Sequence, residues 1–465
     1  MGKMKKIAAI MIAMTMLCTT EAHAAAAYMD DVTREMSLTS YWLSRQLQNV
    51  DEVLADKDQI KLINERVMAD PATKMHDLKK IDENVNTANI NALMFTSGVE
   101  EMKTYTAGGY FDAFGNPVTE ALTNAIVLNT QSTVTRSKVS YGIAAARTEI
   151  RSYPTDAIIT DEVGDLNFDY MANSTLRINE PFVIKSSSND GLYYYGYSSS
   201  TSGWVKAADI AICKDKYEWL NAWDIPSERV LVVLDGKVYL EQSNTNPSVS
   251  GLMLTMGTCL EIAPQGSYGN LVTNRSPIQN YVVYVPVRNL DGSYKKELAL
   301  VSEGEHVHEG FLPLTTRNLL NVAFEMLGDT YGWGGMLASE DCSGYIRSIY
   351  KCFGLELPRN TTWQAASSSV LHHDLTGMSA EQKKSVLNLM PAGSVIFFKG
   401  HEMMYLGQNA GKYYVISSSS SVADSKTGQK MRLRSVLISS LDTKRANGTS
   451  WIDNVYMVNV PYVMK

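Results

Sequence analysis

Cys342 is the residue of this chain whose surroundings best suit a nucleophile. Asp341 precedes it and can cap a helix. The apolar residues that follow recur at helical spacing: Tyr345, Ile346, Ile349, Tyr350 and Phe353. Unsatisfied backbone N–H groups in the first turn of a helix favour a negative charge. Because the thiolate is the attacking form of cysteine, this position predicts a thiol with a lowered pKa.

A cysteine nucleophile needs a base, and His401 differs in its setting from the other histidines. It follows Gly400 and the buried-looking run 395–398, so we expect it to open a strand. A base on a strand that faces a nucleophile at a helix start is the papain-type arrangement. A structural histidine is the commoner case, so spacing alone leaves both roles open for His401.

The base in turn needs a group that orients it, and Ser417 is our candidate. It ends the strand-like run 413–417, which should lie next to the strand of His401. Strand alternation points Ser418 to the opposite face. The alternative is that the serines at 417–421 form only a polar loop.

The elements that must position these residues predict a multi-domain α+β protein. Helical spacing over much of residues 25–141 predicts a mostly helical N-terminal segment. Short runs rich in Val, Ile, Tyr and Thr between turn signals predict small β-barrels at 142–214 and 228–305. One larger β-sandwich is the alternative. Helices followed by strand-like runs predict an α+β domain at 313–465.

Local turn and cap signals sharpen this outline. Three Asp-Gly pairs are of the kind found in hairpin turns: 190–191, 235–236 and 291–292. The run 231–240, with Asp-Gly near its middle, should be a complete hairpin. Thr315 or Thr316 can cap the first helix of the last domain.

Composition and the N-terminus restrict the function classes. The formal charge of −7 argues against a nucleic-acid binder. Residues 1–24 carry lysines, a short apolar stretch and Ala22-His23-Ala24, which predicts a signal peptide and an exported protein, periplasmic or extracellular. No later stretch is apolar enough to span a membrane. The sequence shows no metal or cofactor motif, and it predicts no oligomeric state.

The remaining cysteines are Cys213, Cys259, Cys342 and Cys352, too sparse for a disulfide scaffold. Cys213 and Cys259 are expected to be buried fillers or to form one bridge. A free thiol is therefore available for chemistry.

The order of short motifs in the last domain resembles the NlpC/p60 family of cell-wall cysteine peptidases. The motifs are Tyr331-Gly-Trp-Gly-Gly335, Asp341-Cys-Ser-Gly344, Leu357-Pro-Arg359, Pro391-Ala-Gly393, Phe397-Phe398, and Gly400-His401 running into Met404-Tyr-Leu-Gly407. Upstream, Tyr41-Trp42, Asn179-Glu-Pro-Phe182, Gly203-Trp-Val205 and Asp209-Ile-Ala211 are similar to the subgroup with a helical N-terminal segment and two bacterial SH3-like domains.

The resemblance implies hydrolysis of the γ-D-glutamyl–diamino-acid bond of peptidoglycan stem peptides. It makes Cys342 the nucleophile and His401 the base, and it places the Tyr331 hydroxyl near the oxyanion. Peptide binding is implied for four residues: Asp341, Ser343 and Glu180 at the free amine of L-Ala, and Trp333. Barrels that close one end of the groove would restrict substrates to short fragments with a free N-terminus.

One departure from the family pattern leaves alternatives open. The family often has histidine as third residue, where this chain has Ser417, and a neutral partner stabilises imidazolium less than a charged one does. A non-catalytic peptidoglycan-binding protein is one alternative. A papain-like amidase or acyltransferase acting on another substrate is the other. The sequence does not distinguish diaminopimelate from lysine at the third position of the stem peptide.

Overall fold

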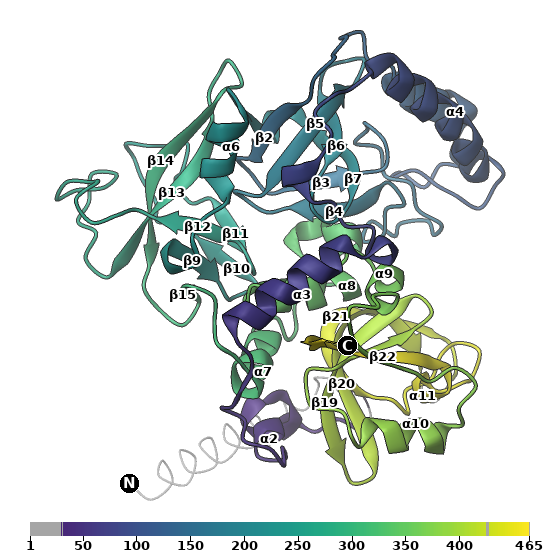
Figure 1. The fold of residues 1–465 in the computed structure, drawn as a ribbon. Helices are drawn as coiled ribbons and strands as arrows, with labels where there is room; N and C mark the ends of the chain where they lie inside the picture. Colours follow the sequence, from purple (N-terminus) through teal and green to yellow (C-terminus); the bar gives the residue numbers. More distant parts are fainter. Residues whose placement is uncertain (1–28, 30, 425–426, 465) are drawn as a thin grey trace, which may run out of the picture.

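Figure 1 shows the computed structural model, which describes residues 29, 31–424 and 427–464. Helical N-terminal segments, two β-domains and a C-terminal α+β domain follow one another along the chain, which confirms the multi-domain α+β class. The predicted signal peptide lies outside the described residues. Among the helices of the described part, none combines the length and the hydropathy that a membrane span requires.

The N-terminal helices do not form one unit. Trp42 of α2 and Ile63 of α3 pack into the core of the C-terminal domain, whereas Met102 of α4 and Ile126 of α5 pack with the first β-domain. Strand β1 pairs with β16 at the start of the C-terminal domain. The elements are η1 (Arg34–Ser37), α2 (Thr39–Leu43), β1 (Val53–Ala55), α3 (Lys57–Ala69), η2 (Pro71–Thr73), η3 (Leu78–Lys80), α4 (Thr87–Thr106) and α5 (Glu120–Asn129).

The first β-domain is an antiparallel sheet in the order β4-β3-β7-β6-β5-β2-β8. Its core contains Ile150, Phe182 and Val205. The predicted Asp190-Gly191 turn joins β5 to β6, and Gly191 has a φ of 73°, which glycine adopts readily. The strands are β2 (Ser140–Ala144), β3 (Thr148–Arg151), β4 (Ala172–Leu176), β5 (Pro181–Ser187), β6 (Tyr193–Tyr197), β7 (Ser202–Lys206) and β8 (Ile210–Cys213), with η4 (Ala207–Asp209) between the last two.

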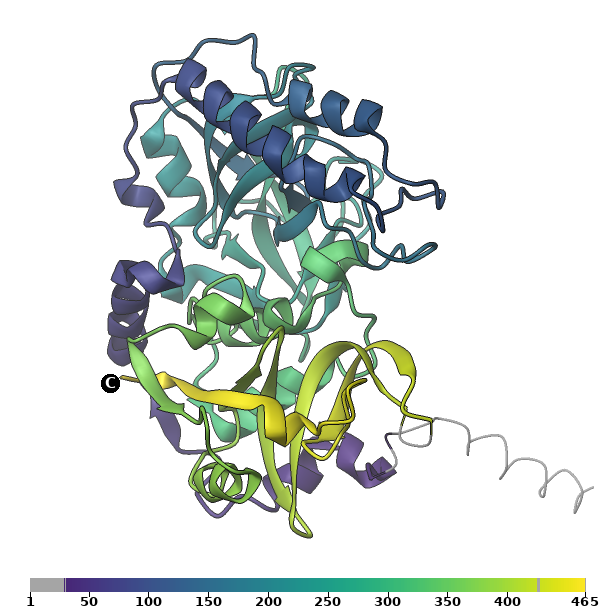
Figure 2. The same ribbon diagram turned by 90° about the vertical axis from the view of Figure 1, so that its right-hand side faces the viewer.

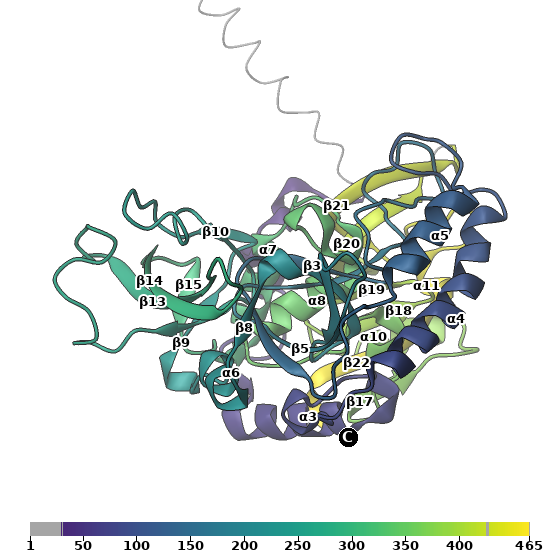
Figure 3. The same cartoon turned by 90° about the horizontal axis from the view of Figure 1, so that it is seen from above.

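Helix α6 (Lys216–Trp223) and η5 (Ser227–Arg229) lead into the second β-domain. Its main sheet has the order β14-β13-β12-β9-β15, and β10 pairs with β11 in a separate ladder. Figure 3 shows this domain projecting away from the first β-domain. Its strands are β9 (Val230–Val233), β10 (Lys237–Tyr239), β11 (Met253–Thr255), β12 (Cys259–Ile262), β13 (Asn280–Arg288), β14 (Tyr294–Ser302) and β15 (Val307–Glu309).

One of the three predicted hairpins is wrong. Asp291-Gly292 joins the paired strands β13 and β14 as expected. The run 231–240 is not a hairpin, because β9 pairs with β12 and β15 while β10 pairs with β11. Long-range partners on both sides of β9 thus override its local turn signal.

The C-terminal domain has one antiparallel sheet in the order β17-β22-β18-β19-β20-β21. Strand alternation divides its two faces: Met404 and Leu406 of β19 join the core that contains the residues of α7 and α8, whereas Met403 and Tyr405 join the core beneath α10 and α11. Its helices are α7 (Thr316–Glu325), η6 (Trp333–Ala338), α8 (Cys342–Lys351), α9 (Thr361–Ala365), α10 (Ala380–Leu387) and α11 (Trp451–Asn454). Its strands are β16 (Leu314–Thr315), β17 (Val370–Asp374), β18 (Val395–Phe398), β19 (His401–Asn409), β20 (Lys412–Ala423), β21 (Lys430–Ser440) and β22 (Val455–Met464).

Helix α8 lies between the β-domains and the C-terminal sheet, as Figures 1 and 2 show. Arg177, at the end of β4, holds this junction together. Its Nε donates to the Met256 carbonyl of the second β-domain at 2.8 Å, and its Nη2 donates to Ser348 of α8 at 2.6 Å. Because Arg177 is almost fully buried, these bonds fix both β-domains against the helix that begins with Cys342.

Candidate active site

Cys342 is the first residue of α8, and Asp341 caps the helix as predicted: the Gly344 N–H donates to Asp341 Oδ1 at 2.8 Å. The thiol is 8% exposed, and its sulfur lies 3.7 Å from the Thr361 hydroxyl. The backbone N–H of Glu402 also donates to the sulfur. The nucleophile is therefore held against the residue that follows His401 in β19.

The surroundings of Cys342 do not produce the lowered pKa that its helix position predicts. Burial, followed by the negative charges of Asp341 and Glu402, raises the pKa of the thiol to about 12. The Thr361 hydroxyl and the Glu402 backbone N–H act in the opposite direction and lower the pKa of the thiol, but they are outweighed. The free protein thus carries a neutral thiol.

His401 begins β19, and two serines of the next strand hold its ring. Its Nε2 lies 3.2 Å from Ser417 Oγ and 3.4 Å from Ser419 Oγ, and the two hydroxyls are 3.0 Å apart. Alternation along β20 puts both serines on the same face, while Ser418 points the other way and donates to the Glu340 carbonyl. The structure thus brings His401 and Ser417 together and adds Ser419, which the sequence analysis had treated only as part of a polar run.

His401 is neutral over the physiological range. Burial, and then the positive charge of Arg445, lowers its pKa to about 4. The rings of Phe398 and Trp451 lie 5.2 and 5.4 Å from the imidazole and restrict its orientation. Among the described residues, no hydrogen bond joins His401 to Cys342, and the Nδ1 atom has no partner. The imidazole lies with Phe398 and Trp451 on the face of β19 opposite to Glu402 and the thiol.

Asp341 and Ser343 are part of a buried ion-pair network with Arg359. The guanidinium donates to both carboxylate oxygens of Asp341, at 2.6 and 3.1 Å, and to the Ser343 hydroxyl at 2.9 Å. Burial acts to raise the pKa of Asp341, but Arg359 and the backbone donors outweigh it, so the net pKa lies below its ordinary value. The charge that was expected to attract a substrate amine is therefore already compensated.

Tyr331 and Trp333 lie on the loop before α8. Tyr331 is 5% exposed, and burial, followed by the charges of Cys342 and Asp341, raises its pKa far above the ordinary value. Its hydroxyl therefore keeps its proton and can act as a donor near the thiol. The ring of Trp333 stacks on Phe168 of the first β-domain, with centroids 4.0 Å apart.

A cavity of about 390 Å³ opens at Cys342, and we call it the thiol cavity. Four of the predicted site residues line it: Cys342, Asp341, Ser343 and Trp333. Arg359, Thr361 and Trp363 form another part of its wall, and Ala172, Asn173 and Thr201 of the first β-domain close it. The pocket is thus shared between the C-terminal domain and the first β-domain.

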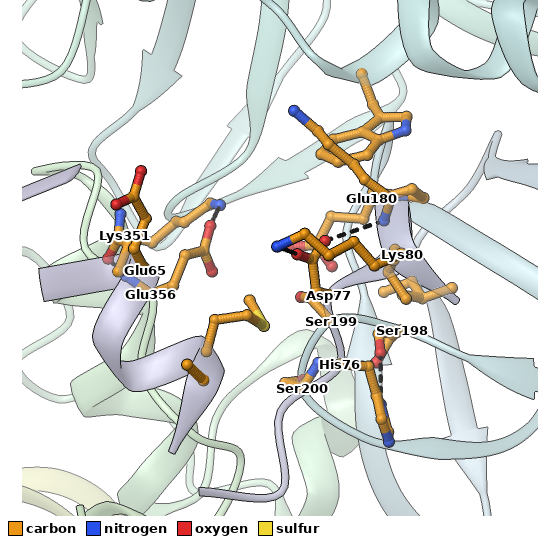
Figure 4. A pocket seen from close by; sticks show the side chains of 18 residues that line it. Glu65, His76, Asp77, Lys80, Glu180, Ser198, Ser199, Ser200, Lys351 and Glu356 are labelled. Carbon is orange, nitrogen blue, oxygen red and sulfur yellow. Dashed lines mark hydrogen bonds and ion pairs between the residues drawn. The ribbon is translucent and has the colours of Figure 1, made fainter. Parts of the chain in front are cut away.

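Glu180 does not line the thiol cavity. Its carboxylate pairs with Arg177 at 3.1 Å and faces a separate cavity of about 660 Å³, together with Lys351 and Glu356 (Figure 4). The reason is local: Glu180 closes the turn that begins at Arg177, since its other oxygen accepts the Arg177 N–H at 3.0 Å. The structure thus corrects the expectation that Glu180 supplies a carboxylate near Cys342.

Glu402 is a residue that the sequence analysis missed. Its side chain is fully buried, and burial raises the pKa of its carboxyl to about 8. It faces Asp341, Arg359 and Cys342, on the side of β19 opposite to His401. A charged residue within the apolar run 402–406 was the available signal, because a carboxyl on a buried strand face is rarely tolerated without a role.

The described residues contain no group of three or more His, Cys, Asp or Glu side chains placed to bind a metal ion. All four cysteines of the described part are free, so the expected alternative of a Cys213–Cys259 bridge is not realised. The chemistry available at Cys342 is therefore that of a thiol nucleophile, and the neutral imidazole of His401 lies on the opposite face of the neighbouring strand β19.

Comparison with known proteins identifies this domain. Residues 328–451 match the NlpC/P60 family, and residues 160–206 match an SH3 domain of the SH3b1 type. The C-terminal domain belongs to the NlpC/P60 family. It is a papain-like cysteine peptidase domain, and the first β-domain is of the bacterial SH3 type.

One solved structure has the same overall architecture. An NlpC/P60 endopeptidase from Photobacterium damselae subsp. piscicida aligns with a TM-score of 0.72 and 17% identity, covering 92% of this chain and 97% of that one. An NlpC/P60 family protein from Bacillus cereus aligns with a TM-score of 0.48 and 15% identity, covering 70% of this chain and 100% of that one. No curated protein sequence matches the chain. The first of these likenesses extends the shared fold of the NlpC/P60 peptidase to nearly the whole chain.

Proposed function

We propose that this NlpC/P60 peptidase hydrolyses the γ-D-glutamyl–diamino-acid bond of peptidoglycan stem peptides, acting on short fragments with a free N-terminal L-Ala. The observation that carries the proposal is the thiol cavity. It has Cys342 in its wall, and residues of the first β-domain, Asn173 and Thr201, close it. A cavity of about 390 Å³ that the first β-domain bounds on one side suits the end of a short peptide better than an intact, cross-linked wall.

The side chains around the thiol cavity suggest the steps of the hydrolysis. In the proposed reaction the Cys342 sulfur attacks the γ-carbonyl carbon while its proton passes to His401, which requires the imidazole to move within hydrogen-bond reach of the sulfur. The backbone N–H of Cys342 and the Tyr331 hydroxyl donate to the oxyanion of the tetrahedral intermediate. Collapse of the intermediate breaks the C–N bond, and His401 gives its proton to the departing amine. A water molecule, activated by His401, then cleaves the thioester and releases L-Ala-D-Glu.

Proton transfer from the thiol accompanies the attack and does not precede it. With pKa values of about 12 for Cys342 and about 4 for His401, the free enzyme holds a neutral pair. Ser417 and Ser419 accept and relay the Nε2–H hydrogen bond when His401 becomes positively charged. Two hydroxyls in sequence polarise each other, which partly replaces the missing ring or charge at the third position.

The test is incubation with L-Ala-γ-D-Glu-meso-diaminopimelate and detection of L-Ala-D-Glu by mass spectrometry. Cys342→Ala should abolish release, whereas Cys259→Ala, which removes a free thiol outside the thiol cavity, should retain it. Acetylation of the substrate amine should lower turnover if Asp341 and Ser343 contact that amine. Unchanged turnover of the acetylated peptide would remove both residues from the binding site.

A second candidate, a non-catalytic wall-binding protein, is favoured by one observation. No hydrogen bond joins the Cys342 thiol to His401 among the described residues, and the thiol pKa is raised. Tight binding of the tripeptide by the wild-type protein without any product would establish this function in place of hydrolysis. Export to the periplasm or the cell surface is proposed from the N-terminal sequence, and fractionation of cells that express the full chain tests it.

A further inference from the structure

The loop between β3 and β4 of the first β-domain contacts the C-terminal domain beside the active site. We call residues 161–168 the docking loop. Its Asp165 pairs with Arg434 of β21 at 2.5 Å, and its Asn167 Oδ1 accepts a hydrogen bond from the same guanidinium at 3.0 Å. Nearer the start of β21, Arg432 pairs with Glu162. Two arginines of one strand thus bind one loop of another domain.

Arg434 lies at a bulge of β21, and its backbone conformation is unusual for an arginine. The pairing with β20 shifts by one residue at this point, because Ser435 faces Ser419 whereas Arg432 faces Ser421. The φ of Arg434 is 48°, in the left-handed region that favours glycine. A residue with a side chain in this region costs free energy, and such residues concentrate at functional sites. We therefore expect the Arg434 side chain to have a role that glycine cannot fill.

The same residue also holds Tyr331 in place. The backbone carbonyl of Arg434 accepts a hydrogen bond from the Tyr331 N–H at 2.9 Å, and a bridge between Thr330 and Ser435 continues this contact. On its other side, Tyr331 forms a bridge with Glu340. The Tyr331 side chain is buried near the thiol. The bulge in β21 therefore sets where the backbone of Tyr331 lies, and with it the position of the hydroxyl.

The segment that joins Tyr331 to α8 is supported by the first β-domain as well. Arg147, in the turn before β3, donates from its Nη2 to the carbonyl oxygens of Gly335 and Ser339, at 2.8 and 3.1 Å. These bonds reach the segment from the same domain as the docking loop. The loop that carries Tyr331 and leads to the nucleophile is thus held from outside the C-terminal domain at several points.

We infer that Arg434 is a positioning residue, through which the docked first β-domain places the Tyr331 hydroxyl at the thiol. The inference rests on the proposed function, in which that hydroxyl donates to the oxyanion. The guanidinium of Arg434 binds Asp165 and Asn167 of the docking loop, while the carbonyl of the same residue holds Tyr331. A displacement of the docking loop therefore reaches Tyr331 through one residue. The peptidase domain is complete for catalysis only when the first β-domain is docked.

The experiment measures kcat and KM of full-length variants on L-Ala-γ-D-Glu-meso-diaminopimelate. Arg434→Met should lower kcat by about ten- to hundredfold with little change in KM, because a displaced donor fails in the transition state. Arg432→Met is the matched control: it also loses an ion pair with the docking loop, but its backbone pairs with β20. It should change kcat by less than about twofold. Asp165→Asn and Glu162→Gln remove the partners of the two arginines, and each should follow its arginine.

A double-variant cycle separates positioning from general damage to the fold. Tyr331→Phe removes the donor itself, so Arg434→Met should have little further effect on kcat in the Tyr331→Phe protein. Losses that multiply in the double variant would overturn the inference. An equal loss of kcat in Arg432→Met would overturn it as well.

Amide hydrogen exchange tests the same contact without catalysis. The Tyr331 amide should exchange about fivefold faster or more in Arg434→Met and in Asp165→Asn, and at the wild-type rate in Arg432→Met. An unchanged rate in Arg434→Met would overturn the inference even if the protein hydrolyses the peptide. Faster exchange in a protein that releases no product would support the positioning role and count against the proposed hydrolysis alone. Far-UV circular dichroism of each variant checks its folding.

Discussion

Arg359→Met tests whether the buried ion pair holds Asp341 and Cys342 in place. The guanidinium is 6% exposed and the carboxylate 9%, and two charge-assisted hydrogen bonds of 2.6 and 3.1 Å join them. At about 1.5–3 kcal/mol each, their loss would cost roughly 3–6 kcal/mol. This agrees with the roughly 3–5 kcal/mol for breaking one side of a buried pair. The unpaired Asp341 would also raise the thiol pKa further and lower kcat.

The chain offers a matched surface control. Arg317 makes the same two-bond contact with Asp51, at 2.6 and 2.9 Å, but both side chains are largely exposed. We expect Arg317→Met to cost less than about 1 kcal/mol. The double variant Asp341→Asn/Arg359→Met should recover most of the stability, because it leaves no buried charge and Asn still caps α8. It should not recover activity if Asp341 contributes to substrate binding.

Hydrogen exchange of the amides of α8 (Cys342–Lys351) is the appropriate assay, because a chain of several domains need not unfold in one step. The free energy of opening should fall by several kcal/mol in Arg359→Met and far less in Arg317→Met. Circular dichroism confirms that each variant is folded. Equal costs for the two arginines, or a double variant no more stable than Arg359→Met, would refute the reasoning.

Four further predictions concern titration and the base. Burial raises the pKa of Glu402 to about 8 from an ordinary 4.5, so the free energy of unfolding should fall as the pH rises from 4.5 to 8, by on the order of 5 kcal/mol in total. Glu402→Gln should flatten this dependence of the unfolding free energy on pH, measured by urea denaturation. An unchanged dependence would contradict the buried carboxyl. Alkylation of Cys342 by iodoacetamide in the free enzyme should stay slow at pH 7 and accelerate only in strong alkali, because the pKa of the thiol is about 12. Rapid labelling at pH 6 that is absent in Cys342→Ala would show an ionised thiol instead. The acid limb of kcat/KM should lie near pH 4, the pKa of His401. The double variant Ser417→Ala/Ser419→Ala should lower kcat by about tenfold or more. Each single variant should lower kcat less, since either hydroxyl can hold the Nε2 atom of His401. Full activity of the double variant would remove the serine pair from the mechanism.

The placement of Arg177 connects the two β-domains to the catalytic helix. Its bonds to Met256 and Ser348 join three parts of the chain that are far apart in sequence. Since residues of the first β-domain also close the thiol cavity, the position of that domain decides how much of a peptide can enter. In the proposed function, the packing of that domain against the C-terminal domain would set the size limit on substrates.

The sequence by itself determined the features that depend on neighbours along the chain. Asp341 before an apolar helical repeat predicted the cap and the helix that begins at Cys342, and both are present. Thr315 caps α7 for the same reason. Strand alternation correctly separated Ser417 from Ser418. Hydrogen bonds over three or four residues and side-chain periodicity are local properties, so spacing alone reveals them.

Only the tertiary structure decided the properties that depend on burial and on partners distant in sequence. The thiol pKa is raised because packing buries Cys342 against Glu402, which a helix start cannot indicate. Asp341 is neutralised by an arginine that the fold returns to it from the loop before α9. The cavity of about 410 Å³ at His401 likewise unites the β18–β19 turn with the loop before α11. Charge and solvent access in a site are sums over everything packed around it, and those neighbours are known only once the chain has folded.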